Sequence, residues 1–327
     1  MTNIINIFKN KSRYTNTIYH KVKYILQNAG YQVSNVYNEN AFLNLVIGGD
    51  GTFLNAVHLS NFSTIPFIGI NTGHLGFYQE IEVDMLEEFV DALVKGQYKV
   101  EELTVLQSKV NNKNINAINE VVVKSKKNQI IRLKVFIDGN FLESYSGDGL
   151  IISTPHGSTA YNLSANGAIL HQSLNGYQLT PIAPVYSNLN KALKCPVVLP
   201  NDANVEISVS RRDNYHTIFI FDGREFFTKD YKIKIGVSPN KINKLILNKN
   251  HYWSNIKNKL MWLIKRYCIK YISNYIPSQR CSNFSTCALA IFYHQSKGNL
   301  RFICWCKPYK PRINIASRFI CRSCFSS

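Results

Sequence analysis

The stretch Gly48-Gly49-Asp50-Gly51-Thr52 places one carboxylate inside a turn made mostly of glycine. Glycine lets the backbone adopt positive φ angles and approach a ligand closely. A carboxylate in such a turn repels phosphate unless it coordinates a metal or accepts a proton from a substrate hydroxyl group. Phosphoryl transfer to an alcohol needs such a proton acceptor, so Asp50 is the first candidate catalytic residue. The alternative is a structural Asp50 that caps a helix.

The segments on either side of Asp50 are the ones that must position it. An apolar run at residues 43–47 precedes the turn, and the segment 53–57 that follows it is also largely apolar. This order predicts a strand, a tight turn and a helix. The start of a helix supplies free N–H groups and a positive partial charge, both of which suit phosphate. The sequence has no Gly-x-x-x-x-Gly-Lys-Ser/Thr loop, which argues against P-loop chemistry.

The whole chain is expected to combine an α/β domain with an all-β domain. Residues 1–98 alternate between strand-like segments (4–8, 43–47, 66–70) and helix-like segments (15–28, 84–95). This alternation predicts a parallel sheet in a doubly wound domain that carries the glycine-rich turn. Period-two segments within residues 99–250 (121–123, 133–137, 205–209, 217–221, 232–235) are separated by turn signals such as Asp222-Gly223. They predict a β-sandwich, and a helix over 251–267 is expected to return to the first domain.

Residues 268–327 differ in composition from the rest of the chain. They contain nine of the 38 Lys and Arg residues, no Asp or Glu, and seven of the eight cysteines. Cys304-x-Cys306 and Cys321-x-x-Cys324 have the spacing of zinc-ligand pairs. We favour instead a basic, Cys-rich, non-homologous extension that contributes nothing to the chemistry, and we predict no metal ligands from the protein.

Composition also bears on location and partners. The longest uncharged apolar stretches fall short of the roughly 20 residues needed to span a bilayer. The N-terminus has no small-residue cleavage site, so we expect a cytoplasmic protein without a membrane partner. Of the net charge of +18, nine charges lie in residues 268–327, and the remaining +9 suits anionic small molecules as well as nucleic acid.

Residues 146–161 form a second dense group of candidate residues. They contain a Gly-Asp-Gly turn at Asp148, a short apolar strand, and a Gly-Ser-Thr cluster that opens a helix at Ala160. Unpaired N–H groups and hydroxyls at such a helix start can hold phosphate or ribose oxygens. Asp148 could accept hydrogen bonds from an adenine amino group or a ribose hydroxyl. Ser158 or Thr159 as a simple N-cap is the structural alternative, and His156 is interpreted as a surface turn histidine.

Taken in chain order, these motifs resemble those of the NAD kinases. The matching segments are residues 48–52, 69–77, the pair Asn119-Glu120, and residues 148–167. Several such motifs in one order are far more specific than any one of them. The resemblance covers about residues 1–267 and stops there, which supports setting residues 268–327 aside.

The resemblance implies a nucleotide held between an α/β domain and a β-sandwich. The implied reaction is ATP-dependent phosphorylation of the adenosine 2′-hydroxyl of NAD to give NADP, with Mg²⁺ or a similar divalent metal. Asp50 would match the family's proton acceptor. The positions that would bind NAD are Asp50, Gly51, Asn119, Glu120, Ser146, Asp148, Thr159, Ala160, Tyr161, Asn162, Leu163, Ser164 and Ala183. Family members are commonly dimers or tetramers, so the resemblance implies a homo-oligomer.

The sequence departs from the family pattern at three positions. Ser146 stands where a basic residue is frequent, His156 where threonine is frequent, and Arg224 where glutamine is frequent. The first change removes one potential phosphate or ribose partner. None of the three affects the proposed base.

Two rival functions fit parts of the sequence. A lipid kinase of the diacylglycerol or sphingosine type has a nucleotide-binding turn similar to Gly-Gly-Asp-Gly-Thr, but this class gives no reason for residues 148–161. A basic nucleic-acid-binding protein would explain the charge and the aromatic content. However, the aromatic residues lie largely in strand-like apolar runs, and no nucleic-acid-binding motif is present. We therefore expect no nucleic-acid partner.

Overall fold

The computed structural model describes residues 3–73, 76–127, 129–185, 193–227, 232–247, 252–253 and 255–257. The chain divides into two units, residues 1–262 and 263–327. Every described residue belongs to the first unit. The expected extension at 268–327 with its cysteine pairs, and most of the expected helix at 251–267, lie outside the described residues.

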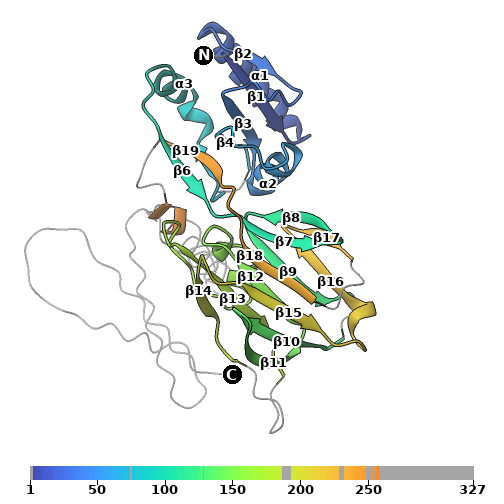
Figure 1. Cartoon of the computed structure of the whole chain (residues 1–327). Coiled ribbons are helices and arrows are strands. Elements are labelled where there is room, and N and C mark those ends of the chain that lie inside the picture. The colour runs from blue at the N-terminus through green and yellow to red at the C-terminus, as the bar shows by residue number, and fades with distance from the viewer. Residues whose placement is uncertain are drawn as a thin grey trace, which may run out of the picture. The chain divides into compact units, whose positions relative to one another are not determined.

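The first part of this unit is built on a seven-stranded sheet (Figure 1). Its strands follow the order β2-β1-β3-β4-β19-β6, and β5 also pairs with β4. Their bounds are β1 Ile4–Lys9, β2 Gln32–Ser34, β3 Leu43–Gly48, β4 Phe67–Asn71, β5 Gln79–Ile81, β6 Lys99–Leu103 and β19 Ile242–Ile246. The pairs from β2 to β19 are parallel, and β6 is antiparallel to β19. The predicted parallel sheet is confirmed.

Helices cover both faces of this sheet. Helices α1 (Arg13–Asn28) and α3 (Leu86–Val94) share one apolar cluster with β1 and β3, and the 3₁₀ turn η1 (Val83–Met85) leads into α3. Helix α2 (Asp50–Leu59) contributes to a different cluster that also includes residues of β3 and β4. Every residue of β3 is buried, as expected for a strand between two helical layers. The doubly wound arrangement is therefore confirmed.

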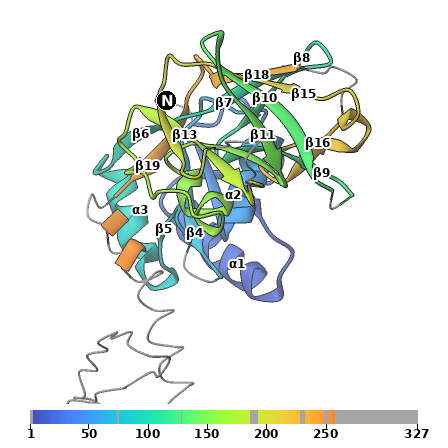
Figure 2. The same cartoon turned by 90° about the horizontal axis from the view of Figure 1, so that it is seen from below.

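Two strands of this sheet come from outside residues 1–98. Strand β6 directly follows that range, and β19 follows all the strands of the second part, yet Figures 1 and 2 show them side by side. Lys244 of β19 is buried, and its Nζ donates to Glu80 Oε1 at 2.7 Å. Local sequence patterns did not reveal this membership, because the strands that pair are far apart in the chain.

The second part is a sandwich of two six-stranded antiparallel sheets. One sheet has the order β11-β10-β15-β18-β7-β8, and the other has the order β14-β13-β12-β9-β16-β17. The bounds are β7 Leu106–Val110, β8 Lys113–Ala117, β9 Glu120–Ser125, β10 Ile131–Ile137, β11 Asn140–Gly147, β12 Gly149–Ser153, β13 Gly176–Ile182, β14 Val197–Pro200, β15 Val205–Val209, β16 Thr217–Phe221, β17 Arg224–Phe226 and β18 Lys232–Val237. One apolar cluster contains residues of both sheets, such as Val135 and Ile207 from one and Val123 and Phe219 from the other. The predicted sandwich is confirmed.

Short turns complete the second part. Asp222 and Gly223 join β16 to β17 with φ angles of 47° and 81°, as in a type I′ hairpin turn. The helix expected at Ala160 is short: the 3₁₀ turn η2 (Gly157–Thr159) leads into α4 (Tyr161–Ser164), and a further 3₁₀ turn, η3, covers Asn214–His216. In the part of the chain that is described, no helix combines the length and the hydrophobicity needed to cross a membrane.

Candidate active site

Asp50 lies where β3 ends and α2 begins. Gly49 occupies the N-cap position, so Asp50 is the first residue of the helix rather than its cap. The Asp50 carboxylate accepts hydrogen bonds from the backbone N–H groups of Phe77, at 3.0 Å, and Tyr78, at 3.1 Å. A Cβ atom on Gly76 would lie 2.5 Å from Asp50 Oδ1, so glycine is needed for this approach. The loop after β4 therefore orients the candidate base.

Tyr78 connects the Asp50 turn to the sandwich. Its ring stacks on Phe53 of α2, with centroids 4.6 Å apart, and on His156, with centroids 5.9 Å apart. Its hydroxyl group donates to Asn119 Oδ1 at 2.5 Å. Burial, reinforced by nearby carboxylates, raises the pKa of Tyr78 well above its usual value. The phenol therefore stays protonated and acts as a donor at neutral pH.

Asn119 and Glu120 stand at the start of β9. The backbone of Asn119 packs directly against Gly157, where any side chain would overlap the Asn119 carbonyl group. Glu120 is buried, and burial, followed by the charge of Asp222, raises its pKa to about 8. Its Oε2 atom has no hydrogen-bond partner among the described residues. A buried carboxyl oxygen without a partner is suited to receive a hydrogen bond from a ligand.

Ser146, Asp148 and Ala183 form a second group around the junction of β11 and β12. The Asp148 N–H donates to the Ile182 carbonyl oxygen at 3.1 Å, and the Val185 N–H donates to the Ser146 carbonyl oxygen at 2.8 Å. Ala183 between them has a φ of 44°, a conformation that is strained for alanine. The Asp148 side chain is exposed. The structure thus brings these three predicted site residues together.

The predicted site residues from Thr159 to Ser164 differ in how available their side chains are. The Asn162 side chain is fully buried, donates to the Ser158 and Ala168 carbonyl oxygens, and accepts from Thr180. Its amide group is therefore used inside the protein. Tyr161 and Ser164 are exposed, while Thr159, Ala160 and Leu163 are half-buried. For Asn162, only a backbone contact with a ligand is compatible with this packing.

His156 is the residue whose environment was predicted wrongly. It was interpreted as a surface turn histidine, but only 5% of it is exposed. Burial, with a smaller effect of Lys244, lowers its pKa to about 3, so the ring is neutral. Both ring nitrogens lack a hydrogen-bond partner among the described residues. The tight packing of Gly157 on Asn119 draws this turn inward, and that contact had no sequence signal.

Sequence reasoning also missed the contributions of Tyr78 and Asp222. Tyr78 directly follows the 69–77 motif, and the residues next to it in the sequence gave no sign of a contact with Asn119. Asp222 was recognised as a turn residue, and its carboxylate accepts from the backbone N–H groups of Ile118, Asn119 and Glu120. A polar residue in a predicted turn was the available signal for Asp222.

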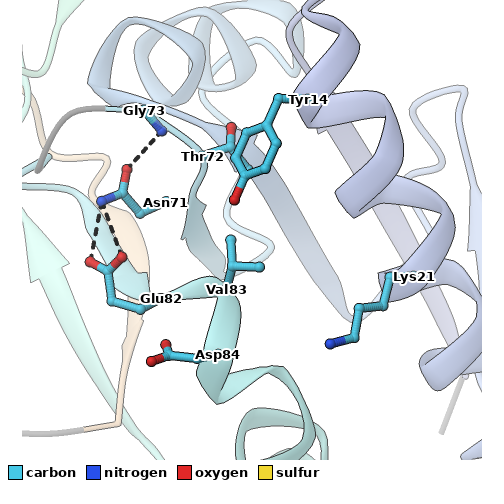
Figure 3. Close-up of a pocket in the computed structure, with 8 residues that line it drawn as sticks. All are labelled: Tyr14, Lys21, Asn71, Thr72, Gly73, Glu82, Val83 and Asp84. Atoms are coloured by element: carbon cyan, nitrogen blue, oxygen red, sulfur yellow. Dashed lines mark hydrogen bonds between the residues drawn. The ribbon is translucent and has the colours of Figure 1, made fainter.

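A cavity of about 480 Å³ opens beside the loop that follows β4 (Figure 3). Its lining residues are Tyr14, Lys21, Asn71, Thr72, Gly73, Glu82, Val83 and Asp84. The Thr72 N–H donates to the Gly48 carbonyl oxygen, so this wall of the cavity adjoins the Asp50 turn. Parallel α/β sheets bind ligands outside the carboxyl ends of their strands. The cavity has that position, next to the end of β4.

The described residues contain no group of three or more His, Cys, Asp or Glu side chains able to hold a metal ion. A cage made by the protein alone therefore does not fit this part of the chain. Magnesium commonly binds through one or two carboxylates together with substrate phosphates.

Two family models match the chain. The ATP-NAD kinase N-terminal domain matches residues 4–98, and the ATP-NAD kinase C-terminal domain matches residues 118–246. The chain is 43% identical over 268 residues to an NAD kinase of Finegoldia magna, covering 79% of this chain and 98% of that protein. It is 36% identical over 224 residues to an NAD kinase of Flavobacterium psychrophilum, covering 66% of this chain and 74% of that protein.

Solved structures with the same fold include two nucleotide complexes. Yeast NADH kinase complexed with NADH has a TM-score of 0.69 at 19% identity, covering 86% of this chain and 90% of that one. An NAD kinase from Archaeoglobus fulgidus in complex with ATP has a TM-score of 0.65 at 23% identity, covering 78% of this chain and 98% of that one. At these identities the likeness concerns the fold.

Proposed function

The chain belongs to the NAD kinase family, and we propose that it transfers the γ-phosphoryl group of ATP to the 2′-hydroxyl of the adenosine of NAD, giving NADP and ADP. The observation that carries the chemistry is the Asp50 carboxylate, which the N–H groups of Phe77 and Tyr78 orient at the start of a helix. The comparisons give no support to a lipid kinase or a nucleic-acid-binding protein.

In this mechanism Asp50 accepts the proton of the 2′-hydroxyl. The oxygen forms a bond to the γ-phosphorus, and the bond between that phosphorus and the β-γ bridging oxygen breaks, so that ADP leaves. A positioned general base contributes about 100- to 10,000-fold to such a rate. The N–H groups at the start of α2 would stabilise the negative charge that develops on the phosphoryl oxygens.

The acceptor nucleotide would bind on the sandwich side of Asp50. Asn119 accepts a hydrogen bond from the Tyr78 hydroxyl group, and the Tyr78 N–H donates to Asp50, so hydrogen bonds link these three residues. Glu120 offers a buried oxygen without a partner, and Asp148 offers an exposed carboxylate. Adenine amino and ribose hydroxyl groups are donors that match both. The assignment of the remaining predicted site residues to NAD stays a prediction.

The cavity beside β4 is the place we assign to the donor nucleotide. Tyr14 is half-exposed and offers a ring on which a base can stack, and Glu82 and Asp84 offer acceptors for ribose hydroxyl or amino groups. The Thr72 wall leads to Gly48, so a triphosphate chain leaving the cavity there approaches Asp50. The donor would therefore reach Asp50 from the α/β part, and the acceptor from the sandwich.

Three further points belong to this proposal. A divalent metal would arrive with the phosphates of ATP, because the described residues make no cage of their own for it. A cytoplasmic location is the second point, and it stays a prediction. A homo-oligomer, dimeric or tetrameric, follows from the family resemblance.

The direct test mixes the protein with ATP, Mg²⁺ and NAD and measures NADP with an NADP-specific dehydrogenase. We expect turnover, and no NADP from either the full chain or a form ending at residue 267 would refute the proposal.

For the donor cavity, Tyr14→Ala should raise the KM for ATP about tenfold and leave the KM for NAD unchanged. Tyr24→Ala, an exposed tyrosine of the same helix that does not line the cavity, is the matched control.

A further inference from the structure

Asp222 is more than a hairpin turn residue. Its side chain has no exposed surface, and it accepts from the N–H groups of Ile118 at 2.9 Å, Asn119 at 2.8 Å and Glu120 at 3.3 Å. Its own N–H donates to the Glu120 carbonyl oxygen at 3.1 Å. A buried carboxylate is stable only when it is paired and hydrogen-bonded. Asp222 therefore holds the backbone that presents Asn119 and Glu120.

A fourth donor reaches Asp222 from the α/β part. His58 Nε2 lies 2.9 Å from Asp222 Oδ2, and only 8% of the His58 side chain is exposed. Because a carboxylate only accepts hydrogen bonds, Nε2 must carry the proton. His58 lies in the last turn of α2, the helix whose first residue is Asp50. One carboxylate thus joins the far end of the base-carrying helix to the Asn119-Glu120 backbone.

We propose that the His58–Asp222 pair positions Asp50 relative to Asn119 and Glu120, and so sets the geometry of phosphoryl transfer without touching either substrate. This inference rests on the proposed function. His58 and Asp50 are separated along the helix by about 12 Å. A tilt of about 5° about His58 therefore moves Asp50 by about 1 Å, and displacements of that size can reduce catalysis about 100-fold.

The chain offers a matched contact at the same interface. Arg224 of the same hairpin donates from Nη2 to Asn55 Oδ1 of the same helix at 3.2 Å, but this contact is exposed to solvent. Exposed contacts contribute little because water replaces them. If the Asp222 carboxylate fixes the position of α2, loss of the Arg224 contact should change kcat little. Loss of the His58 contact should lower kcat greatly.

The test compares two side chains of similar length at position 58. His58→Gln keeps an N–H donor for Asp222, whereas His58→Met removes it. We expect His58→Met to lower kcat about 10- to 100-fold while the KM for NAD changes less than threefold. His58→Gln should keep kcat within about fivefold of the wild type. Arg224→Ala should keep both constants within about twofold. All rates are expressed per folded molecule, measured by circular dichroism and NAD binding.

Equal kcat values for the Met and Gln variants would overturn the inference, because a purely structural contact changes the folded fraction and not the rate of folded enzyme. If the Met variant does not fold, His58→Ala with added imidazole replaces it. Imidazole that restores kcat supports the pair, and imidazole that restores folding but leaves kcat low overturns it. Wild-type turnover remains in every case, so failure of this inference is distinct from failure of the proposed function.

Discussion

The same tripeptide, Gly-Asp-Gly, occurs twice in this molecule with different surroundings. In the first case Asp50 opens a helix, and two N–H groups of a neighbouring loop orient its carboxylate. In the second case Asp148 joins two strands of the sandwich, and its carboxylate is exposed. A shared motif therefore gives one aspartate a fixed orientation and gives the other open access to solvent.

The glycines of the two turns also serve different purposes. A Cβ atom on Gly49 or Gly51 would meet nothing within 4 Å. A Cβ atom on Gly149 would overlap the carbonyl oxygen of Val123, and one on Gly147 would overlap the Tyr145 hydroxyl group. The first turn uses glycine to leave room for a ligand, and the second uses it for close packing. The same Gly-Asp-Gly motif can therefore need its glycines for different structural reasons.

The largest expected effect is on kcat, which should fall much more for a change at Asp50 than for one at Asp148. Asp50→Asn removes the proton acceptor but keeps the side-chain shape, so kcat should fall about 100- to 10,000-fold while NAD still binds. Turnover assays combined with calorimetric titration of NAD check this. Asp148→Asn is the matched variant, and a comparable loss of kcat there would break the comparison.

The next effect is on the free energy of unfolding, which should change in opposite directions at Gly149 and Gly51. Gly149→Ala forces a methyl group against the β9 backbone and should lower the free energy of unfolding by about 1–3 kcal/mol. Gly51→Ala lies in a helix with open space around it, so it should raise that free energy by about 0.5–1 kcal/mol while lowering turnover. Urea denaturation measures both. A destabilised Gly51→Ala variant would show that the first turn is packed as tightly as the second.

A third carboxyl group, that of Glu120, is buried, and its effect on stability should depend on pH. Burial, followed by the charge of Asp222, raises the pKa of Glu120 in the folded protein to about 8, from a usual value of 4.5. Between these pH values the folded state binds more protons, so the free energy of unfolding should fall as the pH rises. Denaturation of the wild type and of Glu120→Gln at pH 5 and pH 8 checks this. The variant should show the smaller decrease, and equal decreases would contradict the assignment to Glu120.

The smallest effect concerns Asp148. Its exposed carboxylate is proposed to accept a hydrogen bond from NAD, and Asp148→Asn keeps one acceptor oxygen but loses the charge. Because an acceptor remains, the hydrogen bond should weaken by about 0.5–1.5 kcal/mol, which raises the KM for NAD about 2- to 10-fold. Steady-state kinetics at varied NAD give this value. An unchanged KM would mean that the second turn has only a structural purpose.

Much of the fold was accessible from local patterns. Alternating apolar segments predicted the parallel sheet and the sandwich, and Asp222-Gly223 predicted a turn, because these features depend on residues close in sequence. The pairing of β6 with β19 was not predicted, because no local period reports which distant strand completes a sheet.

The candidate site was predictable only in part. The glycines around Asp50 predicted a carboxylate with room for a ligand. The structure adds how that carboxylate is oriented. The stacking of Tyr78 between Phe53 and His156 depends on segments from three places in the chain. The burial of His156 likewise depends on Gly157 lying against Asn119. Such contacts arise from tertiary packing, so sequence spacing did not reveal them.

The late position of β19 has a consequence for how the protein is made. A ribosome releases β1 to β4 and their helices early, and β6 soon afterwards, but β6 has no partner strand until the whole sandwich has been synthesised. Until then Glu80 also lacks the Lys244 ammonium group that neutralises it in the folded protein. The sheet that carries the candidate base is thus the first to be translated and the last to be completed. An unfinished chain therefore does not present Asp50 on a complete sheet.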